Sequence, residues 1–128
     1  MKKIFKSHHP RRHAKSFKFA FEGLLHTLLN EPNFRVQLVI VVAVVYFGFK
    51  YSISVIEWGL VTISMGLMLS AEMINTVVEN FLDVLMNEKD DAVKLIKDVS
   101  AGFVLITAII ALIIMFLIFG KYFFQFFI

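Results

Sequence analysis

The sequence predicts an all-α integral membrane protein, with one amphipathic surface helix and three transmembrane helices in a single domain of residues 1–128. Hydrophobic residues make up 59% of the 128-residue chain, and its mean hydropathy is +0.78. This apolar share exceeds the roughly 45–50% that is usual for soluble domains. The chain has no cysteine, which excludes disulfides, thiolate metal sites and a cysteine nucleophile.

The first 30 residues divide into a basic tail and an amphipathic helix. Residues 1–15 are basic and contain Pro10, so we expect a poorly ordered cytoplasmic tail. In residues 16–30 the apolar side chains recur at helical spacing and the polar ones fall on the opposite side, which is typical of a helix on a bilayer surface. The apolar set is Phe17, Ala20, Phe21, Leu24 and Leu28, and the polar set is Lys15, Lys18, Glu22 and His26.

Three later segments are long and apolar enough to cross a bilayer. We expect these spans at residues 33–50, 57–86 and 97–119. Pro32, just before the first of them, favours either a break or the first turn of a helix. Asp98, at the expected start of the third span, is in a position to cap that helix or to pair with a cation.

The distribution of basic residues predicts the orientation in the membrane. Residues 1–18 hold seven lysines or arginines, and no acidic residue precedes Glu22. By the positive-inside rule the N-terminus is expected in the cytoplasm, which places the C-terminus outside after three spans. Anchoring to a membrane surface explains the basic arm better than nucleic-acid binding, so no nucleic-acid partner is expected.

The second span carries five polar residues at intervals that place them on one face. They are Glu72, Asn75, Thr76, Glu79 and Asp83. At about 100° per residue these side chains occupy roughly a third of the helix circumference. A carboxylate at membrane depth is costly and normally marks a functional site. Three helices cannot cover such a stripe by themselves, so we expect an oligomer.

Three classes of function are compatible with an acidic stripe in a membrane. In a lipid kinase the stripe would bring a lipid alcohol and a phosphate donor together, with Glu31 and a second carboxylate holding a metal ion and Lys97 meeting phosphates. In an oligomeric ion or proton channel it would line a pore. A purely structural subunit would not need paired acids. The kinase explains the charged residues Glu31, Lys97 and Asp98 best, although the sequence contains no Gly-rich phosphate loop or Walker motif.

The segment from Glu72 to Glu79 resembles a family signature. It reads Glu72-Met-Ile-Asn75-Thr76-Val-Val-Glu79 and is similar to the E-x-x-N-(S/T)-x-(I/V)-E motif of the small prokaryotic diacylglycerol kinase and undecaprenol kinase family. The residues around it also follow the family's order and spacing. These are Ala20-x-x-Gly23-Leu24, Asn30-Glu31, Phe34-Arg35, Asp83 and Lys97-Asp98.

The resemblance implies a homotrimer in the bacterial cytoplasmic membrane that uses Mg²⁺ and transfers the γ-phosphate of ATP to a lipid hydroxyl. It implies that Glu72 is the general base with Asn75 beside it, and that Glu31 and Glu79 hold the metal. Glu72 and Ala101 would contact the lipid substrate. The residues expected along the nucleotide are Arg12, Phe19, Glu31, Glu79, Glu88, Lys89, Asp90, Lys97 and Asp98.

The resemblance also bears on the lipid acceptor. Gln37 stands where the diacylglycerol-preferring branch carries an acid, and the segment SFKFAFEGL (residues 16–24) resembles the undecaprenol branch of Gram-positive bacteria. Undecaprenol is therefore the favoured substrate, with diacylglycerol as the alternative.

Overall fold

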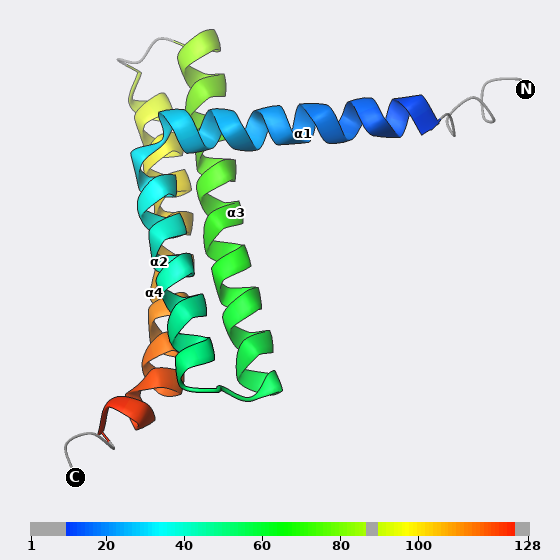
Figure 1. Cartoon of the computed structure of the whole chain (residues 1–128). Coiled ribbons are helices and arrows are strands. Elements are labelled where there is room, and N and C mark those ends of the chain that lie inside the picture. Colours follow the sequence, from blue (N-terminus) through cyan, green and yellow to red (C-terminus); the bar gives the residue numbers. More distant parts are fainter. Residues whose placement is uncertain (1–9, 87–89, 125–128) are drawn as a thin grey trace, which may run out of the picture. The chain divides into compact units, whose positions relative to one another are not determined.

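In the computed structural model, residues 10–86 and 90–124 are described, and they form four α-helices (Figure 1). The helices are α1 (Pro10–Asn30), α2 (Pro32–Lys50), α3 (Val55–Leu85) and α4 (Asp91–Phe124). No strand occurs in these residues, so the predicted all-α class is confirmed. The helices α2, α3 and α4 are each long and apolar enough to cross a membrane. The chain divides into two compact units, Met1–Pro32 with α1 and Asn33–Ile128 with the three long helices.

The helix α1 begins at Pro10, earlier than the predicted start at residue 16. The expectation of an unstructured tail is therefore wrong for residues 10–15, while residues 1–9 lie outside the described residues. Proline is compatible with the first helical position because the N–H that it lacks would have no intrahelical partner there. The basic residues that follow are good helix formers, so a high charge did not prevent helix formation.

The side chains of α1 keep the predicted amphipathic pattern. Phe17 and Phe21 are largely exposed, as expected of a helix whose apolar side faces lipid. Lys18 and Glu22 form an exposed ion pair of 3.7 Å one turn apart, which contributes only a few tenths of a kcal/mol, roughly 0.3–0.5.

The chain leaves the helical conformation between α1 and α2 at Glu31 alone. Asn30 ends α1, and its Nδ2 donates to the backbone oxygen of His26 at 2.8 Å. Pro32 is the first residue of α2, so of the two predicted alternatives the position in the first turn of a helix is confirmed.

The helix α3 begins at a capping box. The Ser54 hydroxyl accepts from the backbone N–H of Glu57 at 3.3 Å, and the Glu57 carboxylate accepts from the backbone N–H of Ser54 at 2.7 Å. This reciprocal pair satisfies two donors that a helix start leaves without intrahelical partners. The cap explains why α3 begins at Val55, two residues before the predicted start at residue 57.

The turn between α2 and α3 depends on a close approach at Gly48. A Cβ atom at this buried glycine would lie 2.6 Å and 2.8 Å from the ring atoms Cη2 and Cζ2 of Trp58, and 3.3 Å from Cδ1 of Ile53. Glycine therefore allows the Trp58 ring to lie against the end of α2.

We expect Gly48→Ala to lower the thermal unfolding temperature in detergent, because the new methyl group must displace the indole ring at a cost of about 1–3 kcal/mol. Gly59→Ala is the matched control, since a Cβ there meets no atom within 4 Å. This control should be neutral or stabilising, because alanine is the better helix former. Equal unfolding temperatures for wild type and Gly48→Ala would contradict the packing role.

The helix α4 begins at Asp91, not at the predicted residue 97. The carboxylate of Asp90 accepts from the backbone N–H of Ala92 at 2.9 Å, which is the hydrogen bond of an N-cap. The expectation that Asp98 caps this helix is therefore wrong, because Asp98 lies two turns inside it. At its other end α4 continues to Phe124, beyond the predicted end at residue 119.

Among the three long helices, α3 runs antiparallel to the other two (Figure 1) and packs most closely against α4. The buried core lies toward the end where α2 meets α3, and it comprises Val44, Ile53, Val61, Met65, Met68, Ala111, Ile118 and Phe119. At that end an ion pair joins Lys121 of α4 to Glu57 of α3, and the rings of Tyr51 and Tyr122 stack with centroids 5.0 Å apart. The polar residues lie toward the opposite end, where α2 and α4 begin.

Candidate active site

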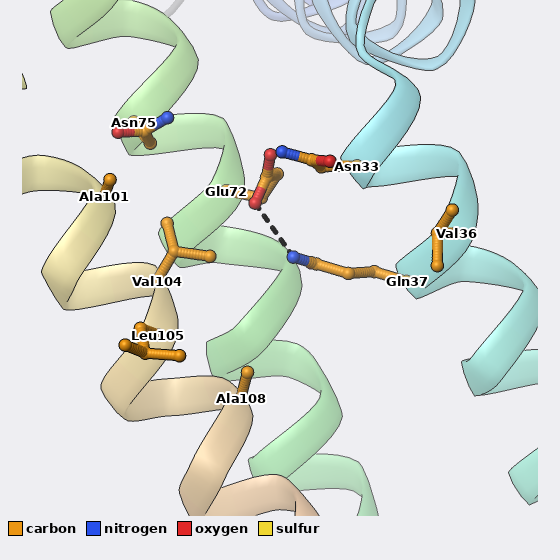
Figure 2. Close-up of a pocket in the computed structure, with 9 residues that line it drawn as sticks. All are labelled: Asn33, Val36, Gln37, Glu72, Asn75, Ala101, Val104, Leu105 and Ala108. Carbon is orange, nitrogen blue, oxygen red and sulfur yellow. Dashed lines mark hydrogen bonds between the residues drawn. The ribbon is translucent and has the colours of Figure 1, made fainter.

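A pocket of about 350 Å³ lies between α2, α3 and α4 near their polar end (Figure 2). The α4 wall is apolar, whereas α2 and α3 contribute amides and one carboxylate. Its lining residues are Asn33, Val36, Gln37, Glu72, Asn75, Ala101, Val104, Leu105 and Ala108. A pocket that is mostly apolar with a few convergent polar groups is typical of a ligand site.

Glu72 is the carboxylate of this pocket and is only 3% exposed. Its Oε2 accepts a hydrogen bond of 2.8 Å from Nε2 of Gln37 on α2, and Figure 2 shows the two side chains pointing toward one another. The backbone oxygen of Glu72 accepts from the hydroxyl of Thr76 at 3.1 Å. Buried carboxylates in ligand pockets are the kind of side chain that serves as a general base.

Asn75 and Glu79 continue the polar face of α3 toward its C-terminal end. Nδ2 of Asn75 donates to Oε1 of Glu79 at 3.0 Å. Asn75 is 8% exposed and its Oδ1 has no hydrogen-bond partner, whereas Glu79 is half-buried. Glu79 lies two turns beyond Glu72, about 10.5 Å along the helix axis. The carboxylates of Glu72 and Glu79 are therefore too far apart along the helix to contact the same atom of a ligand.

Lys97 of α4 forms an ion pair with Asp83 of α3. The pair links the last turns of α3 to the first turns of α4. Both side chains are partly exposed, at 29% for Lys97 and 44% for Asp83, so a phosphate could reach the ammonium group from solvent. Asp98 and Asp90 are exposed on the same end of α4.

Several residues with predicted roles lie elsewhere in the chain. Phe19 is exposed on α1, and Glu31, the residue that follows α1 in the chain, is half-buried. Both belong to the unit Met1–Pro32, whereas Glu79 belongs to the unit Asn33–Ile128, so a shared metal site of Glu31 and Glu79 stays a prediction. The side chain of Arg12 and the residues Glu88 and Lys89 lie outside the described residues.

Two polar residues of the pocket were not among the predicted site residues. Gln37 is buried and bound to Glu72, and Asn33 lies one turn earlier on α2 and also points toward α3 (Figure 2). The sequence did contain a signal for Gln37, because it is the one polar side chain that follows Arg35 in α2 before the tyrosine at position 46. An isolated amide in a membrane helix normally has a partner.

The oxygen atoms near Glu79 are compatible with a magnesium ion. Mg²⁺ prefers oxygen ligands and usually needs only one or two carboxylates, because phosphates and water complete its shell. The Glu79 carboxylate and the unpartnered Oδ1 of Asn75 are oxygen donors of this kind. Among the described residues no group of three or more His, Cys, Asp or Glu side chains comes together.

Comparisons with known proteins identify the family. A family model described as prokaryotic diacylglycerol kinase matches residues 18–119. The chain is 36% identical over 108 residues to a Bacillus subtilis protein named undecaprenol kinase. The aligned region covers 84% of this chain and 88% of that relative. It is 28% identical over 100 residues to a Synechocystis protein named diacylglycerol kinase. In this comparison the aligned region covers 77% of this chain and 57% of the relative.

These relatives are kinases, so the comparisons do not support the ion-channel alternative. Together with the three helices that could span a membrane, they make this chain a membrane protein and an enzyme. The chain belongs to the prokaryotic diacylglycerol kinase family, whose members are lipid phosphotransferases with an alcohol as acceptor.

Proposed function

We propose that this enzyme transfers the γ-phosphoryl group of ATP to the hydroxyl of undecaprenol and so forms undecaprenyl phosphate. The buried Glu72 at the base of a largely apolar pocket carries the proposal, because it combines a proton acceptor with surroundings that suit a lipid alcohol. The 36% identity to a protein named undecaprenol kinase supports this acceptor. Diacylglycerol is the second candidate, supported by the relative with that name.

In the proposed reaction Glu72 is the general base. The lipid oxygen attacks the γ-phosphorus, and a new oxygen–phosphorus bond forms as the bond to the bridging oxygen of ADP breaks. ADP leaves with that electron pair, and the hydroxyl proton passes to Glu72. Positioning and charge neutralisation supply most of the catalysis in phosphoryl transfer, so the carboxylate mainly has to orient the alcohol and accept its proton.

The nucleotide is proposed to bind at the polar end of the helices. Lys97 would contact phosphate oxygens as a point charge. The other residues proposed along the nucleotide are Arg12, Phe19, Glu88, Lys89, Asp90 and Asp98. Glu79 and Glu31 would hold Mg²⁺, which neutralises phosphate charge when it is bound. Ala101, on the α4 wall of the pocket, leaves space for the lipid head.

A homotrimer in the bacterial cytoplasmic membrane is the proposed assembly, with the N-terminus in the cytoplasm. Glu79 and Asp83 are partly exposed on α3 in the single chain, and a charged face on a membrane helix is normally covered by protein or water. Neighbouring subunits would cover this face and complete the site.

A competition assay tests the proposed acceptor. Purified enzyme is given labelled ATP with undecaprenol and dioleoylglycerol in the same mixed micelles. We expect labelled phosphate in both lipids to depend on ATP and Mg²⁺, with a higher kcat/KM for undecaprenol. A preference for dioleoylglycerol would reverse the assignment of the acceptor, and the absence of label in either lipid would reject the function.

A further inference from the structure

Two further pockets continue the Glu72 pocket along α4. The nearer one has a volume of about 340 Å³ and shares Leu105 and Ala108 with the Glu72 pocket. The farther one has a volume of about 440 Å³ and shares Leu112 and Met115 with the nearer one. The three pockets therefore form one continuous groove, which we call the α4 groove.

The α4 groove lies between α2 and α4. Among the described residues α3 packs closely against α4, whereas α2 lies farther from both. Ile40 and Phe47 line the groove from α2. On the α4 side, Leu112 and Phe116 line it and are 70% and 68% exposed. The groove is therefore accessible from the hydrocarbon region of a bilayer.

The lining of the groove changes from polar to apolar with distance from Glu72. No polar side chain lines either of the two further pockets, so a polar ligand group there would lose its hydrogen bonds. The middle part contains Met65, Met68 and Met115, and methionine side chains adapt to irregular ligands. The far part, which we call the phenylalanine section, contains Phe47, Phe116, Phe119 and Phe123.

The width of the groove fits one hydrocarbon chain and not a helix. Leu105 and Met115, which line the nearer pocket, lie roughly 15 Å apart along the axis of α4. Spread over this length, the volume of about 340 Å³ gives a mean cross-section of about 23 Å². A helix about 10 Å across has a cross-section of roughly 80 Å², so a helix of a second copy of this chain does not fit into the groove.

The length of the groove exceeds that of an ordinary acyl chain. Ala101 and Phe123, at its two ends, lie about 33 Å apart along the helix axis, close to the roughly 30 Å of the whole hydrocarbon core. An acyl chain of a bilayer lipid spans half of that core, about 15 Å. With its head at Glu72, such a chain ends near Leu112 and does not reach the phenylalanine section.

We propose that the α4 groove holds the hydrocarbon tail of the lipid acceptor, and that its phenylalanine section favours a long polyprenyl tail over an acyl tail. This inference rests on the proposed function, because it places the acceptor hydroxyl in the Glu72 pocket. Continuity with that pocket, an apolar lining, the width of one chain and the length of a bilayer carry it. The groove thereby assigns a part in substrate choice to the end of α4 that lies far from the reacting atoms.

A substitution that fills the phenylalanine section tests the inference. Gly120 lines this section, and a Cβ atom there meets no atom within 4 Å, so Gly120→Leu can place a side chain in the groove without a clash. Gly59→Leu is the matched control, because Gly59 has the same free space and lies on α3 outside the groove. For each protein kcat/KM is measured with undecaprenol and with farnesol, a short prenol whose tail ends before the phenylalanine section.

We expect Gly120→Leu to lower kcat/KM for undecaprenol about fivefold, since the tail loses only van der Waals contacts that lipid partly replaces. The value for farnesol should change much less, and Gly59→Leu should keep the wild-type ratio of the two acceptors. An unchanged ratio in Gly120→Leu would overturn the proposal. An equal loss for both acceptors together with a changed oligomer size would also overturn it, because a neighbouring subunit would then cover the groove.

A second pair of variants decides the matter even if Gly120→Leu does not fold. Phe116→Ala removes a ring that lines the phenylalanine section, whereas Leu117→Ala removes an equally exposed side chain that lies outside the groove. The preference for undecaprenol over farnesol should fall about fivefold in Phe116→Ala alone. Equal preferences in the two variants would contradict a tail in the groove. Phosphorylation of undecaprenol by the wild type, measured in parallel, shows whether the proposed function itself stands.

Discussion

Glu72→Gln is expected to abolish lipid phosphorylation while ATP still binds. Glutamine has nearly the same shape as glutamate, and its oxygen can still accept the hydrogen bond that Gln37 donates to Glu72. It cannot accept a proton from the lipid hydroxyl. Loss of a general base lowers the rate by about 10²–10⁴-fold. Single-turnover transfer from labelled ATP measures this loss, and a fluorescent ATP analogue measures nucleotide affinity.

Glu72→Asp serves as the second variant for this prediction. Aspartate keeps the charge but is one methylene shorter, so it cannot keep the 2.8 Å contact with Gln37 without a shift of the helices. Its activity should lie between those of wild type and Glu72→Gln. Lipid phosphorylation at the wild-type rate in Glu72→Gln would remove Glu72 from the role of base.

Glu79→Ala is expected to raise the Mg²⁺ concentration needed for half-maximal activity by at least about tenfold, the usual effect of losing a group that supports a bound metal. The substitution removes a half-buried carboxylate and leaves Nδ2 of Asn75 without its acceptor. Two measurements check the result: a Mg²⁺ titration of activity at saturating ATP, and Mn²⁺ binding in the presence of ATP followed by electron paramagnetic resonance.

Asn80→Ala is the matched control for Glu79→Ala. Asn80 is the neighbouring residue on α3, and its Nδ2 donates to the backbone oxygen of Thr76 at 2.8 Å, so it is engaged with its own helix. Its removal should leave the Mg²⁺ titration unchanged. An unchanged titration in Glu79→Ala as well would show that the metal is held by other groups.

The sequence predicted the helices because their signals are local. Three apolar runs of sufficient length, together with Pro32 before the first, are enough to predict the spans. The errors concern helix ends. α4 begins at Asp91, before the predicted start at residue 97, because Asp90 supplies the cap. α1 includes residues 10–15 because arginine, lysine and alanine are good helix formers.

The candidate site was predicted only in part, since spacing along α3 does not reveal partners on other helices. The interval between Glu72, Asn75 and Glu79 predicted a common face, and the hydrogen bond between Asn75 and Glu79 agrees with it. The contact between Gln37 and Glu72 joins residues 35 positions apart and depends on how α2 packs against α3. The ion pair of Asp83 with Lys97 likewise required the three-dimensional structure.

The contacts between helices differ at the two ends of the helix bundle. At the end with Gly48, the Trp58 ring, the stacked Tyr51 and Tyr122 rings and the ion pair of Lys121 with Glu57 tie all three helices together. At the other end, the hydrogen bond from Gln37 to Glu72 links α2 to α3. The aromatic end therefore carries much of the packing between the three helices, and the polar pocket lies away from it.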